Sequence, residues 1–155
     1  MTLNIRHIIS NIAIAATLAV SAFSAQANDE TPTKLAGGKV ISVEEGKKLL
    51  DAGGSAFVDT RAVLNFGKGH VPGATAAAYK EKSEKVENFD AAQDQFELSK
   101  LPADKAKPVV FYSDGPSGWK SYKAAVLAIK AGHKNVMYMR DGFSGWTGKG
   151  FPAES

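Results

Sequence analysis

The segment that most constrains the fold is residues 108–132, in which a short apolar run, a turn of small residues and an amphipathic stretch follow one another. The run 108–112 predicts a buried strand. After the turn, apolar residues recur at helical spacing, at Trp119, Tyr122, Val126 and Ile129. Unpaired amides at a helix N-terminus attract anions, so this strand–loop–helix unit predicts a cradle for negative charge beginning at Ser113.

Further strands are predicted at residues 39–41, 56–58, 74–78 and 136–139, and helices at 43–53 and 143–147. Ser42 and Glu45 form a capping-box pattern at the start of the first helix. Alternating strands and helices favour a mainly parallel sheet covered on both faces. Asp59 and Ser113 each follow an apolar strand, so we expect them at the same edge of the sheet.

Four ordered motifs identify a family resemblance that covers roughly residues 39–152. They are Asp59-Thr60-Arg61, Gly69-His70-Val71-Pro72-Gly73-Ala74, the loop Ser113 to Trp119, and Gly142-Phe143-Ser144-Gly145-Trp146 with Gly150-Phe151-Pro152. Together they resemble a rhodanese (sulfurtransferase) domain. The resemblance implies an α/β fold with a central, mostly parallel five-stranded sheet and helices on both faces. It also implies that the first loop residue is a cysteine carrying sulfur as a persulfide.

In this chain that position is Ser113, and the sequence contains no cysteine. A thiolate would be stabilised by the helix terminus, whereas a serine hydroxyl gains too little from the same field to ionise and has no sulfur for a persulfide. We therefore expect Ser113 to be a small polar residue bonded to loop amides. A nucleophilic Ser113, as in a hydrolase, would need a positioned base such as His70, His133 or Asp59, and no sequence signal places a triad.

The loop remains a candidate anion site, made of Ser113, Asp114, Gly115, Pro116, Ser117, Gly118 and Trp119. Glycines permit close backbone approach, and Lys120 and Lys123 would add positive charge. The negative charge of Asp114 disfavours the binding of an anion at this loop. The arginine that many relatives carry near the loop end is absent, and Gly118 stands where some exported relatives have a second cysteine.

The remaining candidates have mainly structural interpretations. The resemblance implies that Asp59 and Arg61 link a strand end to the loop and that His70 is structural. Trp119 and Trp146 fit core or rim packing better than a stacking platform. No cofactor is implied, and no His, Asp or Glu cluster has metal-ligand spacing.

Residues 1–27 predict a secretory signal peptide, with Arg6 and His7 before an apolar stretch and Ala25-Gln26-Ala27 as the cleavage pattern. The same stretch retained as an anchor is the alternative. The full chain has a net charge of +3 from 19 basic and 16 acidic residues. Removing Arg6 leaves 18 minus 16, or +2, and no basic stripe suggests nucleic-acid binding. We predict a periplasmic protein with a flexible leader at 28–38 and one domain at 39–155.

Residues 80–107 carry the weakest signal. Residues 80–87 are mostly charged, which predicts a solvated surface segment. Phe89, Ala92 and Phe96 recur at helical spacing and suggest a helix docked on the domain.

These observations favour an exported, catalytically silent rhodanese-like domain. Its expected partner is a small oxyanion such as thiosulfate or sulfite, or a periplasmic protein. The alternatives are a sulfurtransferase that works with a partner's thiol and, less favoured, a serine-dependent hydrolase. No nucleic acid, and no membrane beyond the signal peptide, is expected as a partner.

Overall fold

The computed structural model describes residues 29–155, so the predicted signal peptide lies outside the described residues. Five strands form one sheet in the order β1-β5-β4-β2-β3, and every neighbouring pair is parallel. The strands are β1 (Lys39–Ile41), β2 (Ala56–Asp59), β3 (Thr75–Ala76), β4 (Val109–Tyr112) and β5 (Val136–Met139). The α/β fold with a central five-stranded parallel sheet is therefore confirmed, and β3 is shorter than the predicted strand at 74–78.

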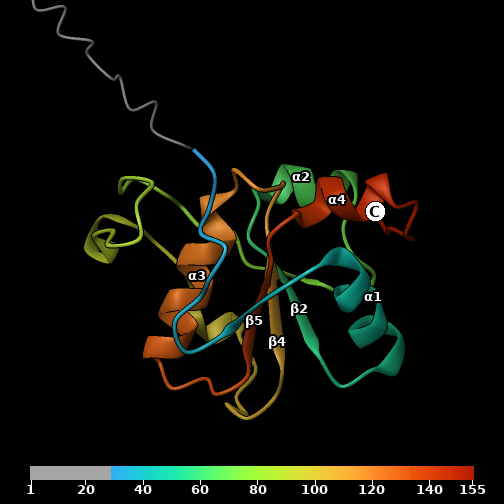
Figure 1. The fold of residues 1–155 in the computed structure, drawn as a ribbon, viewed down its shortest axis with the longest axis horizontal. Helices are drawn as coiled ribbons and strands as arrows, with labels where there is room; N and C mark the ends of the chain where they lie inside the picture. Colours follow the sequence, from blue (N-terminus) through green and yellow to red (C-terminus); the bar gives the residue numbers. More distant parts are fainter. Residues whose placement is uncertain (1–28) are drawn as a thin grey trace, which may run out of the picture.

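Helices cover both faces of the sheet (Figure 1). They are α1 (Val43–Ala52), α2 (Val63–Lys68), α3 (Trp119–Lys130) and α4 (Gly142–Gly148). In β4, Val109 and Phe111 pack with α3, whereas Val110 and Tyr112 pack on the opposite face with residues of α1 and α4. All four side chains of β4 are fully buried, as expected for a strand inside a parallel sheet.

The first helix begins where its sequence signal places it. The Ser42 hydroxyl accepts from the Glu45 amide at 3.1 Å, and the Glu45 carboxylate accepts from the Ser42 amide at 3.0 Å. This reciprocal pair satisfies two amides that the helix leaves without partners. The predicted capping box is confirmed, and α1 ends before Gly53, whose φ of +73° suits glycine.

The segment between β3 and β4 differs from both predictions made for it. Residues 89–96 form no α-helix; the segment contains only two short 3-10 turns, Ala91–Gln93 and Leu98–Lys100. Phe89 and Phe96 nevertheless pack against the core on the α3 side. The helical prediction was wrong because these aromatic residues reach the core from an irregular chain, which apolar spacing alone does not distinguish from a helix.

The prediction of a solvated surface at residues 80–87 was also wrong for part of this range. The Ser83 side chain is buried, and the Glu81 carboxylate lies 2.8 Å from the Nζ of Lys123, a lysine that is itself fully buried. A charged residue in a polar segment is predicted to face solvent unless its partner is known. Here the partner of Glu81 is Lys123, which lies 42 residues later on α3.

Residues 29–38, drawn in blue to cyan, run beside α3 before entering β1 (Figure 1). Thr31 and Leu35 are buried in this segment. The Trp119 indole donates to the Asp29 carbonyl at 2.8 Å, and Tyr138 donates to the Pro32 carbonyl. The part of the predicted flexible leader that the structure describes thus makes specific contacts with α3 and β5.

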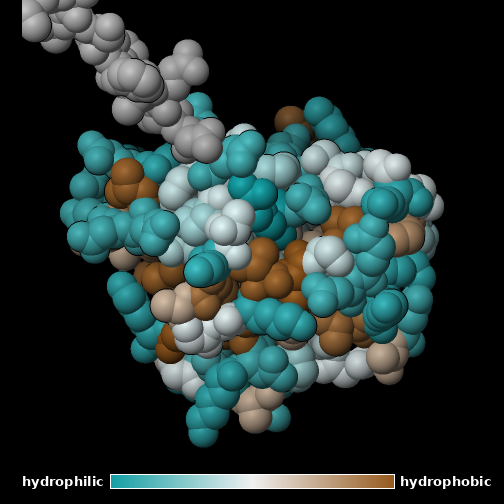
Figure 2. Space-filling model, in the orientation of Figure 1, coloured by the Kyte–Doolittle hydropathy of each residue, from teal (hydrophilic) through white to brown (hydrophobic). Residues whose placement is uncertain are grey.

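Figure 2 shows mostly hydrophilic surface on the face presented, with apolar residues gathered near its centre. Within residues 29–155, no helix has the length and apolar character needed to cross a membrane.

Candidate functional site

The loop at residues 113–118 joins the end of β4 to the start of α3. Asp59, the last residue of β2, pairs in register with Tyr112 of β4. Asp59 and Ser113 therefore lie at neighbouring strand ends on one edge of the sheet, as the sequence predicts. Loops at the carboxyl ends of parallel strands are where α/β proteins bind ligands.

The first half of this loop is held by α4. The Phe143 amide donates to the Ser113 carbonyl at 2.8 Å, and the Ser144 amide donates to the Asp114 carbonyl at 2.9 Å. Gly142 has φ +60°, and a β-carbon there would lie 2.5 Å from the Ser113 carbonyl oxygen. Only glycine lets the start of α4 approach the loop backbone this closely.

Ser113 lies at the bottom of the loop with 2% of its surface exposed. A β-carbon at Gly118 would lie 2.8 Å from the Ser113 β-carbon and 2.9 Å from its Oγ, so Gly118 closes over the serine. Among the described residues, the Ser113 hydroxyl has no hydrogen-bond partner, although the sequence led us to expect a bond to loop amides. The position has room for a small side chain only, and no base of residues 29–155 is hydrogen-bonded to it.

A shallow hollow of about 340 Å³ lies over the loop, lined by Asp114, Gly115, Pro116, Ser117, Gly118 and Ser144. The amides of Asp114, Gly115 and Ser117 donate to no group in residues 29–155, and Gly118 caps α3 without a side-chain hydrogen bond. Backbone donors are thus available beside the hollow. Its lining residues include the acidic Asp114 and no basic residue.

Asp59 and Arg61 form a buried ion pair beneath this edge. Arg61 Nη2 lies 2.6 Å from Asp59 Oδ2 and also donates to the Gly69 carbonyl at 2.6 Å. The guanidinium sits 4.2 Å from the Phe143 ring centroid. Burial opposes the charged form of Arg61, but the bonds to Asp59 outweigh it and raise the Arg61 pKa. The pair links β2 to the turn at Gly69 and to α4, with its charge neutralised internally.

Neither His70 nor His133 forms a hydrogen bond with Ser113. The His70 ring stacks on Phe66 with centroids 3.7 Å apart, and its Nδ1 lies 2.9 Å from the Phe66 carbonyl oxygen. His133 follows the C-terminus of α3, a helix of 12 residues that starts next to the loop. Such a helix is about 18 Å long, so His133 lies at the opposite edge from Ser113. Within residues 29–155, the geometry assembles no triad around Ser113.

The two lysines predicted to support the loop differ in position. Lys120 is half-exposed in the first turn of α3 and forms no ion pair within the described chain. Lys123 is fully buried and points away from the loop into a polar cluster, where it donates to the Ser83 carbonyl at 3.1 Å and to its hydroxyl at 2.8 Å. The prediction that Lys123 adds charge to the loop was wrong, because its ammonium is bound by Glu81 and Ser83 of the segment packed against α3.

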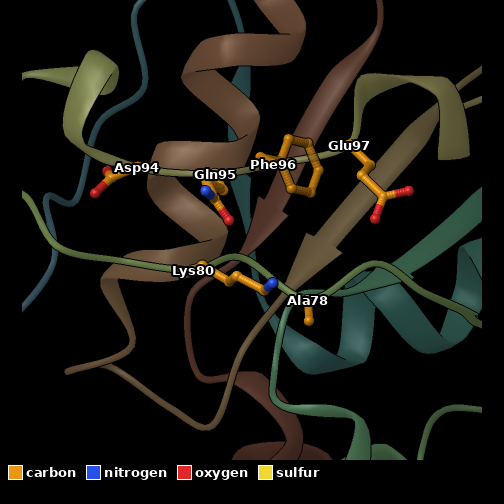
Figure 3. Close-up of a pocket in the computed structure, with 6 residues that line it drawn as sticks. All are labelled: Ala78, Lys80, Asp94, Gln95, Phe96 and Glu97. Carbon is orange, nitrogen blue, oxygen red and sulfur yellow. The ribbon is translucent and has the colours of Figure 1, made fainter.

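A second hollow of about 410 Å³ lies between the chain after β3 and residues 94–97, which run side by side through a bridge of Lys80 with Gln95 (Figure 3). It is lined by Ala78, Lys80, Asp94, Gln95, Phe96 and Glu97. The described part of the chain contains no group of three or more His, Asp or Glu residues placed to hold a metal ion.

The model of the rhodanese-like domain matches residues 42–149, which covers most of the chain. The chain belongs to the rhodanese-like family. It is 31% identical over 114 residues to the uncharacterized protein YibN of Escherichia coli strain K12, covering 74% of this chain and 71% of YibN.

Solved structures show the same fold at lower identity. The thiosulfate sulfurtransferase of Pseudomonas aeruginosa aligns with a TM-score of 0.57 and 22% identity, over 75% of this chain and 20% of that one. The BH2092 protein of Bacillus halodurans gives 0.60 and 18%, covering 76% and 77%. The polysulfide-sulfur transferase of Wolinella succinogenes gives 0.55 and 18%, covering 77% and 80%.

Sequence reasoning missed two sets of residues around this rhodanese-like site. Thr31 and Arg140 contact the loop or its neighbours but stand far from it in the sequence and belong to no motif. The cluster around Lys123 was missed because buried and exposed charges look alike in a sequence. The other polar members of this cluster are Glu81, Ser83 and Asp94, which contact Lys123, and Tyr79, which donates to Asp94.

Proposed function

We propose that this chain is an exported rhodanese-like domain that binds a small oxyanion through its loop and does not form a persulfide of its own. The observation that carries the proposal is the combination of free loop amides with a serine at the base of the loop. The Asp114, Gly115 and Ser117 amides lack protein acceptors in residues 29–155, beside the uncapped start of α3. Such donors suit oxygen atoms of thiosulfate, sulfite, sulfate or phosphate.

Asp114 provides a direct test because it is one of the residues that line the hollow, and its negative charge opposes an anion there. Removing one unit charge close to a solvent-exposed ligand changes binding by about 1 kcal/mol, or roughly fivefold. We expect D114N to bind thiosulfate and sulfate about fivefold more tightly than the natural chain. The measurement is a titration at fixed ionic strength, followed by the NMR shifts of the Gly115 and Ser117 amides.

D104N is the matched control, since Asp104 is exposed and precedes β4, at the opposite edge of the sheet. It makes the same change in net charge, so non-specific electrostatics would affect both variants equally. Absence of amide shifts at Gly115 and Ser117 in both the natural chain and D114N would refute oxyanion binding. The loop would then be better regarded as a protein-binding surface in the periplasm.

The missing thiol is tested by S113C. A thiolate at position 113 would be stabilised by the start of α3, so we expect this variant to gain thiosulfate:cyanide sulfurtransferase activity that the natural chain lacks. Persulfide on S113C, detected by mass spectrometry of the intact protein, is the direct readout. Activity of the natural chain alone would overturn the proposal, and an inactive S113C would mean that the loop no longer holds sulfur-transfer geometry.

A sulfurtransferase that uses a partner's thiol is the second candidate, favoured by exposed apolar residues on α2. Val63 and Leu64 are 68% and 71% exposed, and α2 and α4 lie along the edge where the strands end (Figure 1). Such residues suit contact with another protein. Transfer of sulfur from thiosulfate to an added protein thiol, dependent on this chain and reduced by L64D, would support it; transfer at the uncatalysed rate would exclude it.

A further inference from the structure

The two halves of the loop at 113–118 are held by different parts of the chain. The first half is bonded to α4 through Phe143 and Ser144. The second half contains Pro116, Ser117 and Gly118, and its only bond within the loop is from the Gly118 amide to the Gly115 carbonyl, at 2.8 Å. Because Gly115 precedes this half and Gly118 ends it, the backbone has high intrinsic freedom there and needs external contacts to keep one conformation.

Those contacts come from residues 29–32, which we call the strap. The Thr31 amide and the Thr31 hydroxyl both donate to the Pro116 carbonyl, each at 2.8 Å. Thr31 is 3% exposed, so these two bonds are shielded from water. The Ser121 hydroxyl of α3 also donates to the Gly118 carbonyl at 3.2 Å, but the Thr31 bonds are those that reach this half of the loop from a distant segment, 85 residues away in the sequence.

The strap is itself fixed by one side chain from α3 and one from the residue that follows β5, the strand paired with β4. Arg140, the residue after β5, donates from Nε to the Thr31 carbonyl at 3.0 Å and pairs with Glu30 at 3.0 Å. The Trp119 indole, in the first turn of α3, donates to the Asp29 carbonyl. Thr31 is therefore held on one side by Arg140 while it holds Pro116 on the other.

We propose that Thr31 is a positioning residue for the anion-binding loop, held in place by Arg140, and that the strap keeps the Ser117 amide in its binding orientation. This inference rests on the oxyanion site proposed above. A ligand that binds backbone amides requires the loop to be ordered beforehand, because ordering it at the moment of binding reduces the affinity. Loss of one strap bond should therefore weaken anion binding without unfolding the domain.

The test compares T31V, T31S and T33V in the full chain. Valine removes the hydroxyl that donates to Pro116 but keeps the shape, whereas serine keeps the hydroxyl. Thr33 is exposed and makes no side-chain hydrogen bond within residues 29–155, so T33V is the matched control. One buried hydrogen bond corresponds to about a fivefold change in an equilibrium constant.

We expect T31V to raise the Kd for thiosulfate about fivefold and to speed amide hydrogen exchange by a similar factor at position 31 and at Gly118, whose amides donate to the Pro116 and Gly115 carbonyls. T31S should restore both values, and T33V should leave both unchanged. R140Q should shift the Trp119 indole resonance and reproduce the T31V exchange pattern. Unchanged exchange at position 31 and at Gly118 in T31V would overturn the proposed role of the strap.

Hydrogen exchange is measured without a ligand, so the role of the strap and the binding of an oxyanion are tested independently. If the natural chain binds none of the anions but T31V still speeds exchange in the second half of the loop, oxyanion binding is refuted and the strap stands. If anions bind equally to T31V and to the natural chain, the strap has no part in recognition.

Discussion

At the scale of single residues, Gly142 determines how closely α4 can approach the loop at 113–118. Gly142 adopts φ +60°, and its missing side chain leaves room for the Ser113 carbonyl, the Asp114 carbonyl carbon and the Gly115 nitrogen, all within 2.7 Å of where a β-carbon would lie. These neighbours are backbone atoms, which cannot rotate aside as a side chain would. Position 142 therefore requires glycine for two reasons, its positive φ and the lack of room for a β-carbon.

We expect G142A to destabilise the protein by about 2 to 4 kcal/mol, since a strained φ and a backbone clash add together. It should also disturb the amide resonances of Asp114 and Gly115. Urea unfolding gives the first value and NMR the second. G148A, in the same helix at a site with no neighbour within 4 Å of a β-carbon, should change stability little or slightly increase it. Equal stability of G142A and G148A would contradict the argument.

At the scale of elements, a buried ionic cluster joins α3 to the irregular segment before β4. Lys123 contacts Glu81 at 2.8 Å and Asp94 at 4.0 Å, and its ammonium lies 5.1 Å from the Phe89 ring centroid. Asp94 also accepts from the Tyr79 hydroxyl at 2.7 Å and the Ser83 hydroxyl at 2.6 Å. The cluster gives a segment with little regular structure a specific position on the helix.

K123M should cost about 3 to 5 kcal/mol, because it leaves buried carboxylates without their cation. The double variant K123M/E81Q should recover part of this loss, as the uncompensated charge is then smaller. Denaturant unfolding measures both. K130M, at an exposed position near the end of the same helix, should change stability by less than about 1 kcal/mol. A K123M loss no larger than that of K130M would show that the cluster is not a structural tie.

For the whole molecule, the same cluster predicts how the domain responds to acid. Burial opposes ionisation of Asp94, but hydrogen bonds from Ser83, from the Lys82 and Ser83 amides and from Tyr79 outweigh it and lower the Asp94 pKa to about 2, from 3.8. A carboxyl group with a lowered folded-state pKa contributes stability that is fully present above its unfolded pKa. That contribution is lost as the pH falls toward the folded value.

We therefore expect the melting temperature to fall between pH 4 and pH 2, with Asp94 responsible for part of the slope. D94N should be less stable at pH 7, because its amide cannot accept all the same bonds, and its stability should fall less steeply over this range. Thermal melts of both proteins from pH 7 to pH 2 measure the difference. Parallel curves for D94N and the natural chain would exclude Asp94 as a contributor.

Much of the fold could be predicted from local sequence alone. The capping box at Ser42, the apolar strands around Phe57 and Val110 and the helical spacing from Trp119 are signals that neighbouring residues carry together. The motifs also predicted the family and the loop at Ser113. The short α2 was missed, since its apolar residues Val63 and Leu64 are exposed and give no periodic buried face.

The sequence by itself determined the order of the strands along the chain, the parallel sheet and the absence of a thiol at the loop, because each depends on residue type or short-range pattern. Only the tertiary structure decided that Lys123 faces Glu81 and that Thr31 holds Pro116. These contacts join residues 42 and 85 positions apart. Their energies come from burial and geometry that exist only once the chain has folded, so no local pattern encodes them.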